Sequence, residues 1–325
     1  MILIIGQSGD YSVQRVIDWL LFYGKKFIFL DNEKKISLNY IKVLPDLQFE
    51  LIIDDKFIVN SNDIESYFYR RGYINFLFEE KKVFSFLKNS NEYSLFFSMV
   101  EDKKVIFSFI SNELEKKQKK IGCFKYASVN KLDILKNAYD LGIDIPNTII
   151  TQKKEILNDF YNYNEKKIIS KSIDSCPPIW IDDKIFSSYT NCIDDKMINE
   201  INNIFYISLL QSNILKKYEI RSFYLKGKFY SIAIFSQLDK RTNQDFRRYN
   251  REKKHRTVPY KIPKNLENKI DKLMRKVGLD TGSIDIIYSV DKKYYFLEIN
   301  PEGQYGMVSS SANYNLDKKI ADYFI

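Results

Sequence analysis

The sequence is poor in the residues on which many active sites rely. It contains one histidine, His255, and three widely separated cysteines, Cys123, Cys176 and Cys192, with no C-x-x-C pair. One histidine argues against His-rich metal sites and against most Ser-His or Cys-His catalytic arrangements. A sparse, odd number of cysteines is typical of a reduced intracellular protein, so we expect a cytoplasmic location.

Glycine and proline are also scarce, with 11 and 7 residues among 325. This scarcity argues against flexible linkers, and the length predicts two or three domains that touch directly. No apolar run approaches the roughly 18 residues that a membrane span needs. The first residues, 1–6, begin as a strand without a basic segment, so we expect neither a membrane anchor nor a signal peptide.

Positive charge is present in excess and is concentrated in one window. Lys and Arg number 51 against 42 Asp and Glu, which gives a net charge of +9. Residues 240–261 contain nine Lys or Arg and two acids, and therefore hold +7 of that charge. Such a window is either a solvated loop or an anion site. A nucleotide, an acidic peptide and a nucleic acid all remain open as its ligand.

The first 30 residues predict a βαβ unit. Apolar runs at residues 2–5 and 26–30 read as strands, and the segment between them has helical spacing. Asp10 or Ser12 would cap this helix and Gly24 would end it. This order is typical of the start of a nucleotide-binding fold.

Further along, the pattern predicts a long helix over residues 90–120, with the charged run 115–120 as its solvated end. A shorter helix capped by Asn130 and ended by Gly142 follows. Strands are expected at residues 148–151 and 167–171.

Two β-rich runs, residues 283–290 and 293–300, predict a hairpin near the C-terminus. With a two-residue loop between them, Asp285 lies directly opposite Glu298. The alternation of a strand then places Glu298 and Asn300 on one face. A three-residue loop would shift this register.

The facing carboxylates need compensation. With Cβ atoms about 5 Å apart, two such charges repel by roughly 3 kcal/mol at an effective dielectric of 20. Their apolar neighbours make a solvated pair the weaker interpretation, which leaves a shared proton or a hard divalent cation. The Asn300 amide suits Mg²⁺ as a third ligand, so Asp285, Glu298 and Asn300 are candidate metal ligands.

A second hairpin is predicted over residues 219–235, with its turn at Gly227. Glu219 and Arg221 share a face of its first strand. On this pattern alone the two side chains would form an exposed ion pair, which contributes little to stability.

Several segments together resemble one protein family. Asp285 followed by Leu-Glu298-Ile-Asn300 resembles the metal-binding end of ATP-grasp ligases, whose last lobe carries Asp and then Glu-x-Asn on the next strand. The wider sequence resembles the ATP-grasp peptide maturases of grasp-with-spasm systems, which are relatives of the graspetide or microviridin-type macrocyclases. The segments that carry this resemblance are Tyr69-Arg-Arg-Gly72, Glu219-Ile-Arg-Ser-Phe-Tyr224, Ala233-Ile-Phe-Ser-Gln237, Asp245-Phe-Arg-Arg-Tyr-Asn250, Arg256-Thr-Val-Pro-Tyr260 and Asn300-Pro-Glu-Gly-Gln-Tyr-Gly-Met-Val308.

The resemblance implies a mixed α/β and α+β architecture, the ATP-grasp fold. An N-terminal Rossmann-like (pre-ATP-grasp) lobe would occupy residues 1–120. A central lobe, 121–210, and a C-terminal lobe with the metal site, 211–325, would clamp ATP between them.

The resemblance also implies roles for single residues. The cofactor-binding residues would be Lys131 and Lys171 on the ATP phosphates, Gln211, Ser212, Asn213 and Ile214 in the hinge that receives adenine, and Glu219 near the ribose. The catalytic residues would be Arg221, Arg247 and Arg248, which would stabilise the γ-phosphate and the acyl phosphate. Asp285, Glu298 and Asn300 would hold Mg²⁺. The hinge lacks the acidic residue that many relatives carry just after Gln, which leaves the ribose contact open.

Graspetide synthetases act on a ribosomal precursor peptide with a leader and an acidic core. They join Asp or Glu side chains to Lys as amides or to Ser and Thr as esters. The basic window 240–261 suits an acidic core. The resemblance therefore implies ATP and Mg²⁺ as cofactors and a precursor peptide as partner, with no membrane or nucleic acid. It leaves a homodimer open, because dimers are common among relatives.

Two other functions remain as alternatives. A RimK-like ATP-grasp ligase that adds an amino acid to a protein or small molecule would have the same chemistry and metal site. A basic nucleic-acid-binding protein would explain the charge of residues 240–261, with Tyr249 and Tyr260 stacking on bases. It would not explain the facing carboxylates, which repel nucleic acid.

The paired arginines of the basic window generate a first prediction. Replacing Arg247 and Arg248 together by Ala should impair the reaction more than it impairs ATP binding, because the guanidinium groups would stabilise charge that develops during transfer. Comparing turnover with ATP affinity tests this. A loss of ATP affinity alone would move both arginines to the nucleotide site.

Overall fold

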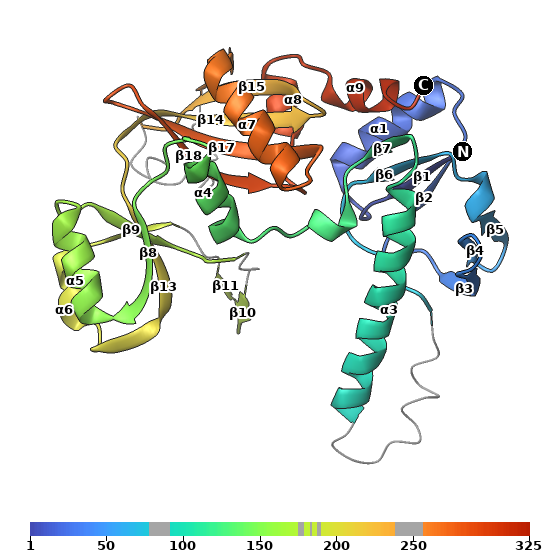
Figure 1. Ribbon diagram of the computed structural model, residues 1–325, viewed down its shortest axis with the longest axis horizontal. Helices are drawn as coiled ribbons and strands as arrows, with labels where there is room; N and C mark the ends of the chain where they lie inside the picture. The colour runs from blue at the N-terminus through green and yellow to red at the C-terminus, as the bar shows by residue number, and fades with distance from the viewer. Residues whose placement is uncertain (78–91, 175–178, 183, 187–189, 238–255) are drawn as a thin grey trace. The chain divides into compact units, whose positions relative to one another are not determined.

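The computed structural model describes residues 1–77, 92–174, 179–182, 184–186, 190–237 and 256–325 (Figure 1). These residues form two compact units. Unit 1 comprises Met1–Ser128, Leu279–Thr281 and Pro301–Ile325, and unit 2 comprises Val129–Gly278 and Gly282–Asn300. The three-lobe division stays a prediction. Residues 279–281 and 301–325, which the prediction assigns to the C-terminal lobe, belong to unit 1, and unit 2 contains most of both predicted ATP-grasp lobes.

A parallel sheet forms the centre of unit 1. Its strands lie in the order β2-β1-β6-β7, and all three pairings are parallel. The strands are β1 (Ile2–Ile5), β2 (Phe27–Leu30), β6 (Ser66–Tyr69) and β7 (Lys119–Ile121).

Helix α1 (Tyr11–Phe22) connects β1 to β2, and Asp10 Oδ1 caps it by accepting a hydrogen bond from the Ser12 amide at 2.9 Å. Gly24 follows the helix with a φ of +63°. The predicted βαβ start is confirmed.

The remaining elements of unit 1 lie in the sequence between the strands of this sheet or directly after them. An antiparallel sheet is formed by β3 (Ile36–Lys42), β4 (Gln48–Ile53) and β5 (Phe57–Asn60), and short 3₁₀ turns lie at Ser61–Asp63 and Phe124–Tyr126. The long helix is confirmed as α3 (Glu92–Leu114). Its predicted solvated end is wrong in part, because Lys119 and Lys120 belong to β7 and pair with β6.

The C-terminal helix α9 (Leu316–Asp322) packs on α1 and follows the short helix α8 (Gly306–Ser311). Asp317 accepts a hydrogen bond from the Trp19 indole at 2.9 Å and pairs with Arg15 at 3.3 Å. Tyr305 donates to the Ser12 carbonyl at 3.0 Å, so these contacts anchor the C-terminal segment on the first helix of the chain.

Unit 2 begins with α4 (Lys131–Asp140), whose predicted cap is confirmed: the Asn130 side chain accepts from the amides of Leu132 and Asp133. An antiparallel sheet follows in the order β12-β9-β13-β8. Its strands are β8 (Thr148–Lys153), β9 (Ile168–Lys171), β12 (Asn191–Ile193) and β13 (Ile204–Ser212), with α5 (Lys154–Tyr163) and α6 (Asp195–Glu200) between them in the chain and β10 (Ile179–Ile181) paired to β11 (Lys184–Phe186).

The second sheet of unit 2 has the order β16-β15-β14-β17-β18. Its elements are β14 (Lys216–Leu225), β15 (Lys228–Phe235), β16 (Arg256–Tyr260), β17 (Thr281–Ser289), β18 (Tyr294–Asn300) and the helix α7 (Lys264–Lys276). Lys226 and Gly227 both have positive φ, +47° and +84°, which is the two-residue turn that suits strand twist. The predicted hairpin that turns at Gly227 is confirmed.

Helix α7 contacts this sheet through a hydrogen bond, because the Tyr224 hydroxyl donates to Asp271 at 2.7 Å.

The hairpin β17–β18 differs from its prediction in two ways that cancel. Its loop has three residues, 290–292, because Tyr288 pairs with Tyr294, and Lys292 adopts a φ of +65°. The register then shifts at a β-bulge, where Leu297 is the extra residue of β18. Beyond the bulge, Asp285 pairs with Glu298 as predicted, so the two-residue loop was wrong and the facing carboxylates are confirmed.

Among the described residues, no helix is both long and apolar enough to cross a bilayer.

Gly122 generates a prediction about stability. Its φ is +77°, and a Cβ there would lie 2.0 Å from the Tyr69 carbonyl oxygen. The change Gly122→Ala should lower the free energy of unfolding by about 3 kcal/mol or more, because backbone atoms must separate. Gly24→Ala is the matched control, with φ +63° and open space around the added carbon, and should cost only about 1–2 kcal/mol. Equal losses in urea unfolding would contradict the close approach at Gly122.

Candidate active site

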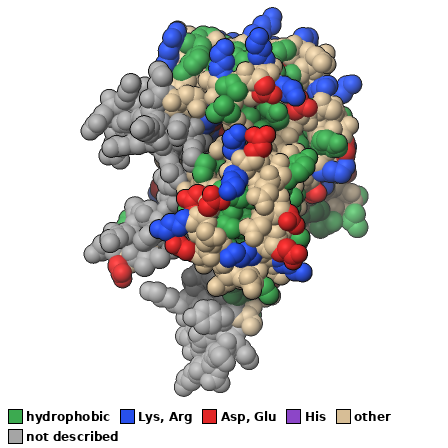
Figure 2. Space-filling model, turned by 90° about the vertical axis from the view of Figure 1, so that its left-hand side faces the viewer, with side chains coloured by type: hydrophobic (Ala, Val, Ile, Leu, Met, Phe, Trp, Pro, Cys, Tyr) green, Lys and Arg blue, Asp and Glu red, His purple; other side chains and the backbone are tan. Residues whose placement is uncertain are grey.

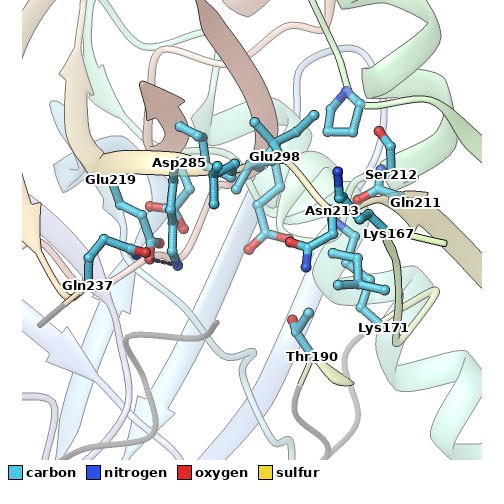
Figure 3. A pocket seen from close by; sticks show the side chains of 17 residues that line it. Lys167, Lys171, Thr190, Gln211, Ser212, Asn213, Glu219, Gln237, Asp285 and Glu298 are labelled. Carbon is cyan, nitrogen blue, oxygen red and sulfur yellow. Dashed lines mark hydrogen bonds and ion pairs between the residues drawn. The ribbon is translucent and has the colours of Figure 1, made fainter. Parts of the chain in front are cut away.

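A cavity of about 310 Å³ opens in unit 2, and its walls come from the four-stranded and the five-stranded sheets of that unit (Figure 3). Its size is that of a small-molecule site. The lining residues are Pro146, Lys167, Ile169, Lys171, Thr190, Gln211, Ser212, Asn213, Ile214, Leu215, Lys216, Glu219, Gln237, Asp285, Ile287, Leu297 and Glu298.

The segment between β13 and β14 forms one wall. Residues 213–215 connect the two sheets, and the Asn213 amide donates to the Lys167 carbonyl at 2.8 Å. Gln211, at the end of β13, is fully buried and donates from Nε2 to the Thr148 hydroxyl at 2.8 Å. Its Oε1 is buried and lacks a hydrogen-bond partner in the described residues, so the cavity wall offers an acceptor to a ligand.

Two lysines enter the cavity from β9 and from the residue before it. Lys167 and Lys171 share one face of this segment with Ile169, since alternate residues of a strand point the same way, and all three line the cavity. Ile168 points to the opposite side and is buried with Leu157 and Phe160 of α5. This alternation places two lysine side chains and the apolar side chain of Ile169 on the cavity wall.

The two facing carboxylates enter from the other sheet, and each has a cation beside it. Arg221 Nη1 lies 3.4 Å from Asp285 Oδ2, and Lys131 Nζ lies 3.5 Å from Glu298 Oε2. Figure 3 shows Asp285 and Glu298 projecting into the same space. Because both acids have a cationic neighbour, the pair needs no shared proton to coexist.

A buried ion pair lies at the start of β14. Lys216 and Glu219 are 7% and 8% exposed, and their side chains form a short ion pair. Ser236 also donates to Glu219, at 3.3 Å. The interpretation of Glu219 and Arg221 as an exposed pair with each other is therefore wrong: Glu219 pairs with Lys216, and Arg221 reaches Asp285 at 14% side-chain exposure.

The structure brings most of the predicted site residues together. Those that line the cavity are Lys171, Gln211, Ser212, Asn213, Ile214, Glu219, Asp285 and Glu298. Lys131 and Arg221 do not line it but contact its two carboxylates. Asn300 follows Glu298 by two positions and pairs with Ser283. Arg247 and Arg248 lie outside the described residues.

Sequence reasoning missed Lys167, Lys216, Thr190 and Gln237, which also line the cavity. The strand alternation from Lys171 could have identified Lys167. The ion pair of Lys216 with Glu219 depends on how the chain enters β14, and no motif signals it.

The donor set of the facing carboxylates fits a hard cation. Asp285 and Glu298 both line the cavity, with 17% and 25% of their side chains exposed, and Asn300 is exposed two positions beyond Glu298. Among the described residues, no group of three His, Cys, Asp or Glu side chains could hold a metal alone. Mg²⁺ is usually held by one or two carboxylates and by substrate phosphates, which is what this cavity could supply.

The described cysteines offer no activated nucleophile at this site. Burial and a hydrogen bond to Glu115 raise the pKa of the Cys123 thiol to about 12, so it is protonated at neutral pH. Cys123 belongs to unit 1, and neither it nor Cys192 lines the cavity.

The described surface in Figure 2 shows no uniformly basic patch of the kind that a nucleic-acid-binding protein presents. On the face in Figure 2, Lys and Arg side chains are interspersed with Asp and Glu among the coloured residues. Most of residues 240–261 lie outside the described residues, so the contribution of that window stays a prediction.

Two sheets joined by residues 213–215 line one cavity, and strand lysines and facing carboxylates line it too; this arrangement is typical of a nucleotide-binding fold of the ATP-grasp type. The model of the RimK-like ATP-grasp domain matches residues 127–324, which is more than half of the chain. The chain therefore belongs to the RimK-like ATP-grasp family. No curated protein matches it.

Solved structures agree in fold. A RiPP-associated ATP-grasp ligase from Chryseobacterium gregarium, in complex with ADP and a leader and core peptide, has a TM-score of 0.80 and 24% identity over 99% of this chain and 95% of that one. The macrocyclase MdnC from Microcystis aeruginosa, bound with its precursor peptide MdnA, has a TM-score of 0.78 and 21% identity over 99% and 98%. A RimK domain protein from Sphaerobacter thermophilus has a TM-score of 0.55 and 10% identity over 99% and 98%. These likenesses confirm the predicted ATP-grasp fold.

The ion pair of Lys216 with Glu219 generates a stability prediction. Lys216→Met should lower the free energy of unfolding by about 3 kcal/mol, because a buried carboxylate then loses its cation. The double change Lys216→Met with Glu219→Leu should cost less than the sum of the single changes. Urea unfolding of the two single variants and the double variant measures this difference. Additive losses would show that the two charges do not interact in solution.

Proposed function

We propose that this chain is an ATP-dependent ligase that macrocyclises a ribosomal precursor peptide. It would phosphorylate Asp or Glu side chains of the core and join them to Lys as amides or to Ser and Thr as esters. The observation that carries the proposal is the pair Asp285 and Glu298, facing each other in a cavity with Lys167 and Lys171. We expect the protein to act in the cytoplasm, where ATP and newly made peptides are available.

The reaction needs no protein nucleophile. A carboxylate oxygen of the peptide attacks the γ-phosphorus of ATP, ADP leaves, and an acyl phosphate forms. A lysine amine or a hydroxyl then attacks the acyl carbon, phosphate leaves, and the nucleophile loses its proton. The peptide has lost one water per bond. The contribution of the protein is positioning and stabilisation of charge, which suits a chain with one histidine.

We assign the nucleotide to the cavity of unit 2. The backbone of residues 212–215 and the buried Gln211 Oε1 would receive the adenine, with Ile169, Ile287 and Leu297 as apolar neighbours. Glu219 would lie near the ribose, and Lys167 and Lys171 would bind phosphate oxygens as point charges.

The facing carboxylates would hold the metal. Mg²⁺ bound by Asp285, Glu298 and Asn300 would neutralise charge on the β- and γ-phosphates. Arg221 and Lys131 lie beside these carboxylates and would stay close to the transferred phosphoryl group. Arg247 and Arg248 remain predicted partners of the acyl phosphate.

The choice between peptide macrocyclisation and amino-acid addition rests on fold likeness. The RiPP-associated ligase and MdnC, whose structures contain precursor peptides, have TM-scores of 0.80 and 0.78, against 0.55 for the RimK domain protein. This difference favours a precursor peptide with leader and acidic core as the partner.

Intact-mass analysis tests the function. The enzyme is incubated with Mg-ATP and the short peptide encoded beside its gene, and loss of one water mass per bond with release of ADP is expected. A gain of one amino-acid mass would instead favour the RimK-like alternative. ATP binding without any change in mass would contradict the maturase function for that peptide, and a nucleic-acid titration would then test the remaining alternative.

The metal assignment has its own prediction. Asp285→Asn and Glu298→Gln keep side-chain volume and should each reduce turnover at least about 100-fold, because the phosphates lose a charged metal ligand. Circular dichroism and thermal unfolding should show an intact fold. Full turnover in both variants would contradict the assignment. Glu200→Gln is a matched control and should leave turnover unchanged, because Glu200 is an exposed acid of unit 2 that pairs with Lys196 at 3.9 Å and does not line the cavity.

A further inference from the structure

The hairpin with the facing carboxylates is attached to unit 1 at both of its open ends. Residues 282–300 belong to unit 2, whereas the residues directly before and after them, 279–281 and 301–325, belong to unit 1. The chain therefore crosses between the units just before Asp285 and directly after Asn300. What fixes these crossing points also restrains the two strands that carry the carboxylates.

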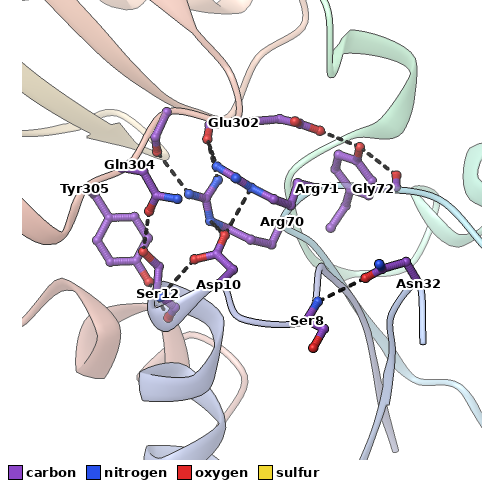
Figure 4. Close-up of polar contacts among 12 residues, drawn as sticks. Ser8, Asp10, Ser12, Asn32, Arg70, Arg71, Gly72, Glu302, Gln304 and Tyr305 are labelled. Atoms are coloured by element: carbon purple, nitrogen blue, oxygen red, sulfur yellow. Dashed lines mark hydrogen bonds and ion pairs between the residues drawn. The ribbon is translucent and has the colours of Figure 1, made fainter. Parts of the chain in front are cut away.

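Two arginines hold the crossing after Asn300 (Figure 4). Arg70 Nη1 and Arg71 Nη2 both donate to the Glu302 carbonyl, at 2.8 and 2.7 Å, and Arg70 Nη2 donates to the Gly303 carbonyl at 3.3 Å. The Tyr69 hydroxyl contacts Glu302 Oε1 at 2.7 Å. These bonds reach the main chain only two and three residues beyond Asn300.

Asp10 holds the arginines in turn. Its Oδ2 lies 3.4 Å from Arg70 Nε and 3.0 Å from Arg71 Nε, and its side chain is 1% exposed. The other oxygen, Oδ1, caps α1. Asp10 and Arg70 are buried, and the Arg71 side chain is 23% exposed. The buried Asp10 and Arg70 depend on each other for charge compensation, so the cluster has little freedom to rearrange.

The crossing before Asp285 is held separately. Asp280 Oδ1 accepts a hydrogen bond from the Gly122 amide at 2.9 Å, and Asp280 Oδ2 lies 3.4 Å from Lys120 Nζ. Gly122 is the residue whose added Cβ would meet the Tyr69 carbonyl. The two crossings are therefore tied to neighbouring ends of β6 and β7.

The location is unusual for a parallel sheet. β1 and β6 are neighbours, and Asp10 and Arg70 follow their carboxyl ends, where open α/β sheets generally bind a ligand. Here the carbonyls of Glu302 and Gly303 occupy the arginines at that edge. The sheet of unit 1 thus binds a segment of its own chain at the position of a ligand.

From these contacts we infer that Arg70 and Arg71, supported by Asp10, are positioning residues for the metal ligands of β18. This inference rests on the proposed function, because it presumes a divalent ion at Asp285, Glu298 and Asn300. The arginines touch neither the ion nor the nucleotide. They fix the main chain at residue 302, and thereby limit the positions that Asn300 and Glu298 can take.

Metal affinity measures this role directly. Mn²⁺, which accepts the same oxygen ligands, is titrated by electron paramagnetic resonance into the full-length protein with ADP present. Arg71→Met should weaken Mn²⁺ binding about tenfold, as the loss of an outer support of a metal ligand does. Binding of ADP without metal should stay unchanged. Arg71→Lys should recover part of the affinity, because an ammonium group cannot contact Asp10 and Glu302 together as the guanidinium does.

Arg15→Met is the control, since Arg15 is an arginine of unit 1 that pairs with Asp317 away from the cluster. It should leave Mn²⁺ affinity unchanged. Tyr69→Phe, which keeps the ring and removes the contact to Glu302 Oε1, provides a second variant should Arg71→Met fail to fold, and should also weaken Mn²⁺ binding. Wild-type Mn²⁺ affinity in folded Arg71→Met or Tyr69→Phe, with only a lower melting temperature, would overturn the inference.

The same titration separates this inference from the proposed function. A wild-type protein that binds Mn²⁺ with ADP but leaves every peptide unchanged in mass would contradict macrocyclisation, and the comparison of variants would still decide the role of the arginines. A wild-type protein that binds no Mn²⁺ with ADP would overturn the inference together with the metal assignment.

Discussion

The candidate site depends on holding two negative charges face to face. Asp285 and Glu298 pair directly across neighbouring strands, where their repulsion opposes the register that joins them. Arg221 and Lys131 offset this repulsion from two different elements, β14 and α4. One electrostatic requirement, the compensation of two facing carboxylates, thus involves three parts of unit 2. The register of β17 with β18 sets the acids opposite each other, β14 supplies Arg221, and α4 supplies Lys131. A site arranged in this way is ready to receive the charge of a phosphate chain and a cation.

The hairpin shows how far local patterns can be trusted. The alternation of polar and apolar residues identified both strands and their facing acids. Turn chemistry was the weak point, because Val290, Asp291 and Lys292 give no sequence signal that separates a two-residue from a three-residue loop. The bulge at Leu297 restores the pairing that the longer loop displaces. The prediction of Asp285 opposite Glu298 was thus right although its loop was wrong.

Residues near each other in sequence were easier to predict than partners brought together by the fold. The βαβ start, the Asn130 cap and the turn at Gly227 follow from local signals, and all are confirmed. Asp10, Arg70 and Glu302 are far apart in the chain, and their cluster is visible only once β1 and β6 lie side by side. The same limit applies to the pairing of Arg221 with Asp285, which depends on β14 and β17 being neighbours. Family resemblance supplied roles that residue patterns could not.

The packing of the last 25 residues affects how this protein can be divided. The family model spans residues 127–324, a stretch that would ordinarily be read as a self-contained domain. Yet α9 rests on α1 through Asp317 and Trp19, and the ring of Phe324 lies 6.0 Å from that of Phe68. A fragment that begins at residue 127 would expose these surfaces and would lose the contacts of Arg70, Arg71 and Gly122 with the residues just outside the hairpin β17–β18. The segment that matches the family and the unit that packs together therefore differ in this chain, because residues 301–324 belong to the matched segment and to unit 1.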